Sequence, residues 1–223
     1  TKMNYTLVIM GIILVVIVYI LYKVIDEKGR SIAGKMDLNS AQNGVPLKNT
    51  GKADSTRYYI GAWLYVNSLN GTQTIYSIGT SATTYLKVEI TDTAQLQYSI
   101  KNGDATTANH IIMNNFPLQK WVYVVISVDN NVVDLYIDGK LISSHKIDPI
   151  PLQINENSNI NFGEVNAFLA KMEREPKPMD PSYAWSKYME GNGGNYFSRM
   201  LSNYGGTLTL TKNDMDVREF QLF

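Results

Sequence analysis

Two pairs of acidic residues carry the groups that glycoside hydrolysis requires. That reaction needs two carboxylates at a fixed separation on one face of a protein, one as nucleophile or base and one as acid. Glu89 and Asp92 stand three positions apart and would lie on opposite faces of a strand, whereas Glu173 and Glu175 adjoin a proline-rich connection. Neither pair has the spacing of such a site, so we expect no catalytic residues and no enzymatic activity.

The histidines and the loop acids are weaker candidates for chemistry. His110 and His145 fall in strand-like runs without a Gly-x-Ser-x-Gly motif, so we expect surface or core roles rather than a catalytic triad. Asp92, or Asp129 with the two asparagines that follow it, could offer oxygen ligands to calcium. A hairpin turn explains residues 129–131 equally well. The sequence therefore favours no cofactor and no metal, with calcium as the alternative.

Aromatic residues are abundant, with fifteen tyrosines and three tryptophans. Trp63, Trp121 and Tyr136 sit inside alternating runs, and we expect them in the core. The core should also include Val125, Leu135 and Ile137. A second group lies near an expected short helix and a glycine-rich segment, where rings could form an exposed surface that contacts protein or glycan. These candidates are Tyr183, Trp185, Tyr188 and Tyr196.

Short runs of alternating apolar and polar residues, separated by turn dipeptides, begin at Arg57 and recur along the chain. This pattern predicts an all-β antiparallel sandwich. Asp138-Gly139 is the clearest turn, because it joins residues 132–137 to residues 140–145 through a two-residue loop. Asp180-Pro181 supplies an N-cap and a proline at the first position of a short helix near 181–190.

The pattern divides the chain into three regions. Residues 26–53 show neither a helical nor a strand period, so we expect a stalk or linker there. Residues 54–223 are expected to form the sandwich domain, with the short helix and a C-terminal hairpin included. Residues 1–25 are expected to be an N-terminal transmembrane anchor.

The anchor prediction rests on Leu7 to Tyr22, sixteen residues without a charge or a proline. Extended to residues 5–25, the segment would form a helix of about 30 Å, which matches the hydrocarbon thickness of a bilayer. A cleaved signal peptide and a buried core helix are the alternatives, but the first has a shorter apolar core and the second is rarely apolar on every side. We therefore expect the bilayer to be a partner through residues 5–25.

Charge and composition limit the other partners. Lys23, Lys28, Arg30 and Lys35 follow the apolar segment, so the positive-inside rule places the C-terminal domain on the cytoplasmic side. The absence of cysteine agrees with a reducing compartment and excludes disulfides. An ectodomain remains the alternative, in which case the sequon at Asn70 becomes relevant. A formal net charge of zero and no basic stripe argue against nucleic-acid binding.

Six segments follow one another in an order known from one family: Arg57–Val66, Trp121–Val128, Val133–Leu141, Asn161–Gly163, Phe168–Met172 and the helix at Asp180-Pro181. In this order they resemble the laminin-G and pentraxin-like branch of the concanavalin A-like lectins and glucanases. Together they span roughly residues 54–191. The resemblance implies a concanavalin A-like antiparallel β-sandwich, or jelly roll, preceded here by one transmembrane α-helix.

A single N-terminal span before such a sandwich also resembles membrane-associated virion proteins of large nucleocytoplasmic DNA viruses. That resemblance implies a minor capsid protein on the virion's internal membrane, with the C-terminal domain facing the capsid and other virion proteins as partners. We therefore expect a structural interaction protein. A membrane-anchored lectin that binds glycans at a cell or envelope surface is the alternative.

Overall fold

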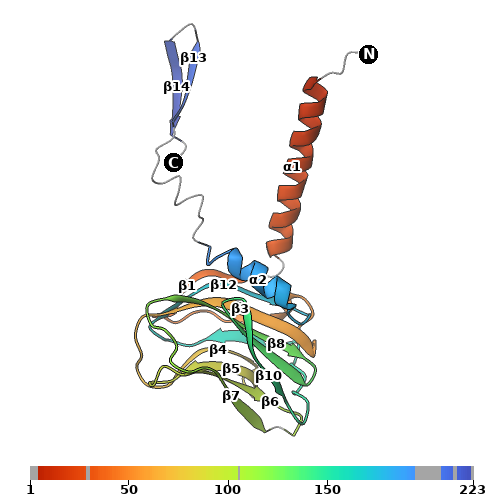
Figure 1. Cartoon of the computed structure of the whole chain (residues 1–223), viewed down its shortest axis with the longest axis vertical. Helices are drawn as coiled ribbons and strands as arrows, with labels where there is room; N and C mark the ends of the chain where they lie inside the picture. Colours follow the sequence, from red (N-terminus) through yellow and green to blue (C-terminus); the bar gives the residue numbers. More distant parts are fainter. Residues whose placement is uncertain (1–4, 29–30, 105, 194–206, 213–214, 222–223) are drawn as a thin grey trace.

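The structure is a computed structural model that describes residues 5–28, 31–104, 106–193, 207–212 and 215–221. Two six-stranded antiparallel sheets pack face to face, and helices flank them (Figure 1). The first sheet, sheet A, has the order β1-β12-β3-β8-β9-β10, and the second, sheet B, has the order β2-β11-β4-β5-β6-β7.

The strands of sheet A are β1 (Ser31–Asp37), β12 (Ala167–Glu175), β3 (Arg57–Val66), β8 (Trp121–Asp129), β9 (Val132–Ile137) and β10 (Lys140–Lys146). Those of sheet B are β2 (Val45–Pro46), β11 (Asn159–Phe162), β4 (Gln73–Gly79), β5 (Thr84–Ile90), β6 (Leu96–Lys101) and β7 (Thr107–Met113). The other elements are α1 (Tyr5–Lys28), the 3-10 helix η1 (Leu47–Thr50), α2 (Pro181–Met189), β13 (Thr207–Lys212) and β14 (Met215–Gln221).

The main core lies between the two sheets. Ile60, Ile126 and Leu135 of sheet A face Ile78 and Leu86 of sheet B in one cluster of fully buried side chains. Burial of this apolar surface is the main favourable term that holds the sheets together. The antiparallel sandwich predicted from the alternating runs is therefore present.

The predicted core residues divide into two groups. Trp63, Val125 and Leu135 are buried, in agreement with the prediction. Trp121 and Ile137 are only half-buried, because Trp121 lies on the outward side of β8 and Ile137 ends β9. Trp121 instead contacts the ring of Tyr65, with ring centroids 5.3 Å apart.

The structure differs from the predicted stalk over residues 26–53. Ser31–Asp37 forms β1 at the edge of sheet A, where Ala33 pairs with Met172 of β12. Leu47 of η1 is fully buried. Single apolar residues in a short strand give no detectable period, and their partners lie more than a hundred residues away along the chain.

Arg174 holds this N-terminal segment against β12. Its side chain is fully buried, and its guanidinium donates hydrogen bonds to the Thr50 hydroxyl, at 3.3 Å, and to the carbonyl of Ala53, at 3.0 Å. The guanidinium carbon also lies 5.0 Å from the centre of the Tyr58 ring. Residues 31–53 are therefore part of the folded domain, and only residues 29 and 30 separate α1 from it.

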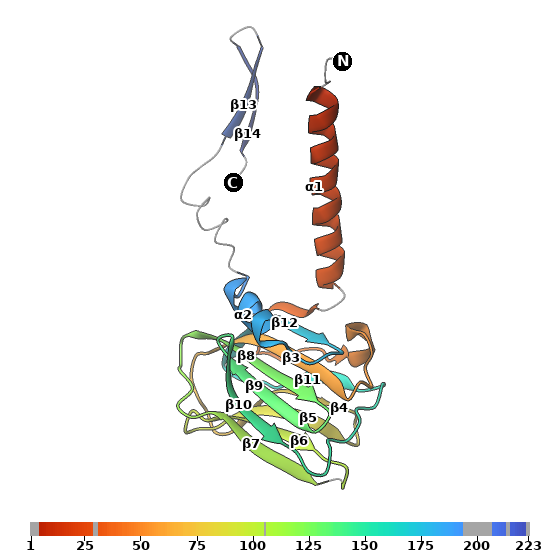
Figure 2. The same ribbon diagram turned by 45° about the vertical axis from the view of Figure 1, so that its right-hand side comes forward.

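The terminal elements stand outside the sandwich. In the two views of Figures 1 and 2, α1 extends away from the side of the sandwich that carries α2. The described residues include no helix that is long and apolar enough to cross a membrane. The hairpin expected near the C-terminus corresponds to β13 and β14, which pair only with each other among the described strands.

Candidate functional site

The outer face of sheet A is covered by α2. Under the helix lies a second buried cluster, in which the ring of Trp63 packs between Tyr123 and Tyr188 with centroid separations of 5.4 and 5.5 Å. The remaining members of the cluster are Tyr59, Val125, Tyr136, Ala170, Met179 and Ala184. Sheet A is therefore packed on both faces, which explains why β8 is buried along nearly its whole length.

The sequence at the start of α2 explains how the helix is placed. The Asp180 carboxylate accepts hydrogen bonds from the backbone N–H groups of Ser182, at 2.8 Å, and Tyr183, at 3.3 Å, as expected of an N-cap. The Ser182 hydroxyl also donates to this carboxylate and is the largest cause of the lowered pKa of Asp180, followed by the two backbone bonds. The backbone N–H of Met179 donates to the Ser127 hydroxyl at 2.9 Å, which ties the segment before α2 to β8.

The turn between β9 and β10 supports the other side of the helix. Gly139 has a φ of +76°, and a Cβ atom there would lie 3.0 Å from both Trp185 Cα and Tyr188 Cβ. The Asp138 carboxylate accepts a hydrogen bond from the backbone N–H of Tyr123 at 2.9 Å. The predicted Asp138-Gly139 hairpin is therefore present, and its glycine also lets α2 approach closely.

The four aromatic candidates are not equivalent. Tyr183 is half-buried and donates its hydroxyl to Glu175 at 3.2 Å, while the half-buried Tyr188 stacks on Trp63. Trp185 alone among the described candidates is exposed, at 45%. Tyr196 lies outside the described residues. The structure therefore brings three candidates onto one short helix and points one of them to solvent.

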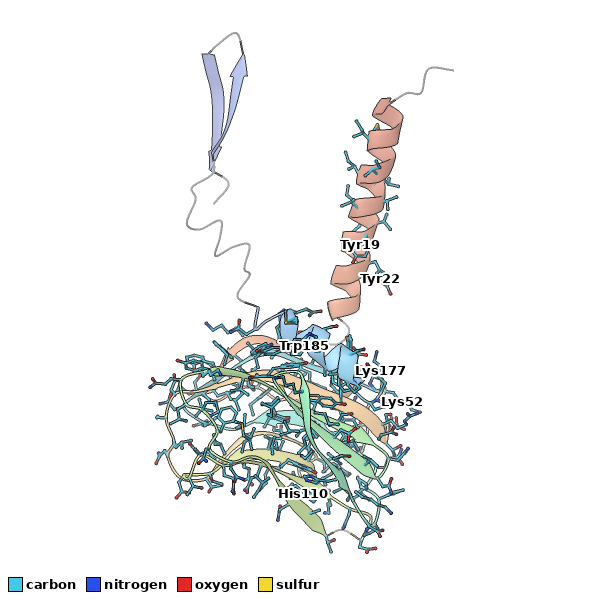
Figure 3. All side chains as sticks on the ribbon, viewed as in Figure 1. Tyr19, Tyr22, Lys52, His110, Lys177 and Trp185 are labelled. Carbon is cyan, nitrogen blue, oxygen red and sulfur yellow. The ribbon has the colours of Figure 1, made fainter. Side chains whose placement is uncertain are left out.

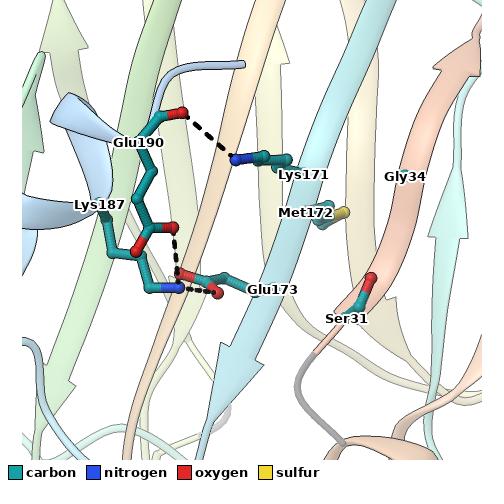
Figure 4. A pocket seen from close by; sticks show the side chains of 7 residues that line it. All are labelled: Ser31, Gly34, Lys171, Met172, Glu173, Lys187 and Glu190. Atoms are coloured by element: carbon teal, nitrogen blue, oxygen red, sulfur yellow. Dashed lines mark hydrogen bonds and ion pairs between the residues drawn. The ribbon is translucent and has the colours of Figure 1, made fainter. Parts of the chain in front are cut away.

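Ion pairs fix the C-terminal half of α2 beside the start of β1 (Figure 4). Lys187 Nζ lies 3.0 Å from a Glu173 carboxylate oxygen and 3.5 Å from one of Glu190, and Lys171 Nζ lies 3.4 Å from the Glu190 carbonyl. Burial disfavours the ammonium of Lys187, but the charge of Glu173 and its hydrogen bond, together with Tyr183 and Glu190, raise the lysine pKa overall. Ser31 and Gly34 of β1 and Met172 of β12 complete the lining of this pocket, whose volume is about 100 Å³.

Glu173 and Glu175 stand two positions apart in β12, so they share one face of the strand. The register shifts between Ala170 and Glu173, and Lys171 has a φ of +46° in this bulge. Both carboxylates approach the Tyr59 hydroxyl, which donates to Glu175 at 2.8 Å and lies 3.4 Å from Glu173. Burial, followed by the two negative charges, raises the pKa of Tyr59 and keeps it a donor.

The carboxylates of Glu173 and Glu175 form ion pairs that hold α2 and the segment before it against sheet A. Lys177 Nζ lies 2.8 Å from a Glu175 oxygen, and Lys187 pairs with Glu173 as above. The side chains of Glu173 and Glu175 are only 13% and 9% exposed. The cluster therefore binds α2 to sheet A, whereas a glycosidase needs its carboxylates open to a sugar.

The outer face of sheet B is an open polar groove. It has a volume of about 450 Å³ and is lined by Thr84, Lys87, Glu89, Gln97, Ser99, Lys101, Thr107 and Asn109 from β5, β6 and β7. Lys87 and Glu89 form an ion pair at 2.9 Å. Ammonium, amide and hydroxyl groups at this density suit a polar ligand. This groove was not predicted, although the polar positions of three successive alternating runs in the sequence indicate it.

The remaining chemical candidates have structural roles. The His110 and His145 rings stack across the edges of the two sheets with centroids 4.5 Å apart, and His145 Nδ1 lies 3.2 Å from the Tyr98 hydroxyl. Asp129 receives a bidentate pair from Arg57 at 2.8 and 3.2 Å, beside a turn in which Asn130 has a φ of +54°. Across the described residues, no group of three or more His, Cys, Asp or Glu side chains could hold a metal.

Comparison with known proteins agrees with this architecture. The sequence model of the Concanavalin A-like lectin/glucanases superfamily matches residues 39–171. No curated relative matches the chain significantly.

Among solved structures, the receptor binding domain of botulinum neurotoxin D is similar with a TM-score of 0.59 and 15% identity, over 72% of this chain and 44% of that one. The serotype D domain in complex with N-acetylneuraminic acid has a TM-score of 0.56, 13% identity, and coverages of 72% and 43%. The serotype G binding domain has a TM-score of 0.51, 16% identity, and coverages of 61% and 36%. The chain spans less than half the length of these domains, and the likeness shows the fold alone.

Proposed function

Because this chain belongs to the Concanavalin A-like lectin/glucanases superfamily, we propose that it is a non-enzymatic interaction protein that α1 anchors in a membrane. The observation that carries the proposal is the exposure of α1. Ile12, Leu14 and Ile17 are each at least half exposed, and the other described apolar side chains of the helix resemble them. A large exposed apolar surface requires another apolar environment to cover it.

The sequence of the segment supports a bilayer as that environment. Twelve of the sixteen residues from Leu7 to Tyr22 are Leu, Ile or Val. At roughly −0.3 to −0.6 kcal/mol each, they contribute about −4 to −7 kcal/mol to insertion. Lys23 follows at the position where a long cationic side chain can reach the interface.

The flanking charges orient the protein. By the positive-inside rule, Lys23, Lys28, Arg30 and Lys35 favour the cytoplasmic side for the sandwich. On that side, the protein would serve as a minor virion component that joins an internal membrane to a capsid, with other virion proteins as partners. Locating the chain in purified particles, before and after detergent extraction, tests this role. Detection in host membranes but not in particles would contradict it.

The absence of catalysis belongs to the same proposal. Glu173 and Glu175 are the only described pair of neighbouring carboxylates on one strand face of this site, and α2 covers them. Turnover of β-glucans by the full chain, lost in Glu173→Gln, would contradict a non-enzymatic role. The matched control is Glu156→Gln on the surface.

Membrane retention during carbonate washing tests the anchor. The wild-type full chain should stay with the membranes. Ile13→Arg with Ile17→Arg should release it, because two arginines at the helix centre cost about 5 to 7 kcal/mol and cancel the gain from the apolar residues. Leu141→Arg, at an exposed position of β10, is the control that should leave retention unchanged. Wild-type protein in the wash supernatant would rule out the anchor.

The polar groove of sheet B favours glycan binding as a second candidate function. Its lining offers hydrogen-bond donors and acceptors, and Lys101 adds a cation that suits an acidic sugar. One similar structure was solved with N-acetylneuraminic acid, which is a property of that protein. A glycan array with the full chain in nanodiscs tests this candidate. A signal that Lys101→Ala abolishes and Lys48→Ala preserves would support it.

Glycosylation separates the two candidates by sidedness. Asn70 lies exposed in the loop between β3 and β4, within a sequon. A glycan at Asn70 would place the sandwich on the lumenal or outer side, which favours the lectin. An unmodified Asn70 in protein made in a eukaryotic host favours the cytoplasmic, capsid-facing role.

A further inference from the structure

The junction between α1 and the sandwich is short. The helix ends at Lys28 and β1 begins at Ser31. Three peptide units span at most about 11 Å, and the helical turns after Lys23 add about 7 Å. The edge of sheet A would therefore lie within about 18 Å of the hydrocarbon, where the headgroup layer already occupies the first 5 to 7 Å.

Helix α2 lies beside this entry point. Ser31 pairs with Glu173 of β12, and Glu173 in turn binds Lys187 of α2. Ser31, Lys187 and Glu190 line one pocket (Figure 4). Figures 1 and 2 both show α2 on the side of the sandwich from which α1 departs. Helix α2 thus lies, with the start of β1, on the side of the domain that would face the bilayer in which α1 sits.

The outward side of α2 carries two exposed apolar residues, Trp185 and Met189, beside the exposed Ser182 and Ser186. Trp185 and Met189 stand four positions apart, so they lie on the same side of the helix, and they are 45% and 65% exposed. Ala184 and Tyr188 face sheet A instead. Tryptophan is the residue that membrane interfaces favour, because its ring is apolar and its N–H can still reach water or headgroups.

Two lysines lie near the ends of α2, beside the stripe formed by Trp185 and Met189. Lys171 extends beside the C-terminal end of α2, and Lys177, which is 57% exposed, precedes its N-terminal end. Figure 3 shows Trp185 and Lys177 on the side of the sandwich nearest α1 and His110 of β7 on the opposite side. Basic residues next to an apolar stripe are the usual arrangement of a helix that lies on a membrane surface.

We propose that the Trp185–Met189 stripe of α2 docks into the interfacial layer of the same bilayer that holds α1. This inference rests on the proposed function, since it requires α1 to be a membrane anchor. Docking at a second point would fix the orientation of the sandwich. The outer face of sheet A would rest on the membrane, and the polar groove of sheet B would face away from it, toward a capsid protein or a glycan.

A pair of single-cysteine labels tests the docking, because the natural chain contains no cysteine. Met189→Cys and Thr107→Cys are made in the full chain, labelled with an environment-sensitive fluorophore and reconstituted in phosphatidylcholine vesicles. Thr107 is an exposed residue of the groove and serves as the matched control. A nitroxide on the lipid near the glycerol level should quench the Met189→Cys label several-fold more than the Thr107→Cys label. Trp185→Ser should reduce that difference.

The outcomes separate this inference from the anchor itself. Retention after carbonate washing with equal quenching at the two positions would keep the anchor and refute the docking. Release by carbonate would refute the anchor. If the Met189→Cys label is shielded from both the lipid nitroxide and aqueous iodide, a protein contact covers the stripe and the docking is refuted. The two labels could also be quenched equally in phosphatidylcholine and differ only when the vesicles contain 20% phosphatidylserine. That result would show that charge, rather than the Trp185–Met189 stripe, drives the contact, and it would refute the docking.

Discussion

The outer face of sheet A is buried and the outer face of sheet B is open, and the residue patterns of their strands reflect this difference. On sheet A, Trp63 and Tyr123 lie under α2, and nearly all of β8 is buried. On sheet B, β5 alternates buried and half-exposed residues, and its outward side chains line the groove. A strand buried on both faces reads as a continuous apolar run, and a strand buried on one face reads as an alternation. The comparison indicates that sheet A is an internal layer and that sheet B offers an exposed surface for a ligand or partner.

Truncation of Trp63 should give the largest difference in stability between a variant under α2 and a variant on the groove. The Trp63 side chain is 8% exposed and packs against two rings, so Trp63→Ala should lower the free energy of unfolding by about 3 to 5 kcal/mol. Gln97→Ala on the groove should change it by no more than about 0.5 kcal/mol. Urea denaturation of the full chain in detergent measures both. Similar losses for the two variants would refute the distinction between the faces.

Alanine substitutions at two glycines with positive φ distinguish the cost of backbone strain from the cost of disturbing the packing of α2. Gly139→Ala forces a Cβ atom to 3.0 Å from α2, whereas Gly71→Ala meets nothing within 4 Å at nearly the same φ. Both changes cost about 1 to 2 kcal/mol for the backbone, and Gly139→Ala should add roughly 1 to 3 kcal/mol for overpacking. Thermal unfolding of the two variants measures the difference. Equal losses would show that α2 does not rest on the β9–β10 turn.

The stacked histidines join the edges of the two sheets and predict a smaller, pH-dependent effect. Burial, and then the charge of His145, lowers the pKa of His110 in the folded protein. As the pH falls, His110 therefore takes up a proton in the unfolded chain before it does so in the folded protein. The stability that is present above about pH 6.5 is lost as the pH falls through the lower pKa of the folded state. His110→Gln should flatten the dependence of the unfolding free energy between pH 7 and 5. A slope that is unchanged in His110→Gln would assign the pH dependence to other groups.

Features set by local sequence could be predicted. The N-cap at Asp180, the proline that follows it and the two-residue turn at Asp138-Gly139 each act within a few residues, and the structure contains α2 and the hairpin where these signals lie. The alternating strands could also be predicted, because their pattern indicates which side of the strand faces the core.

Features set by distant partners could not be predicted. Residues 31–53 lack a period because β1 is ordered by β12 and Leu47 by the core. A bulge before Glu173 shifts the register of β12 against β3, and no simple alternation of residue types reveals it. Trp121 reads as a core residue, but it lies on the outward side of β8 against Tyr65. The groove of sheet B exists only because β5, β6 and β7 are neighbours.

The height of the sandwich above a membrane tests the account most directly. Neutron reflectometry of the full chain in a supported phosphatidylcholine bilayer resolves the density of protein and water along the membrane normal. With α1 in the bilayer and β1 starting at Ser31, the protein layer should begin at the headgroups without an intervening water layer. A flexible stalk over residues 26–53 would instead leave a hydrated gap of about 30 Å. Such a gap, or the absence of a bound protein layer, would contradict the account.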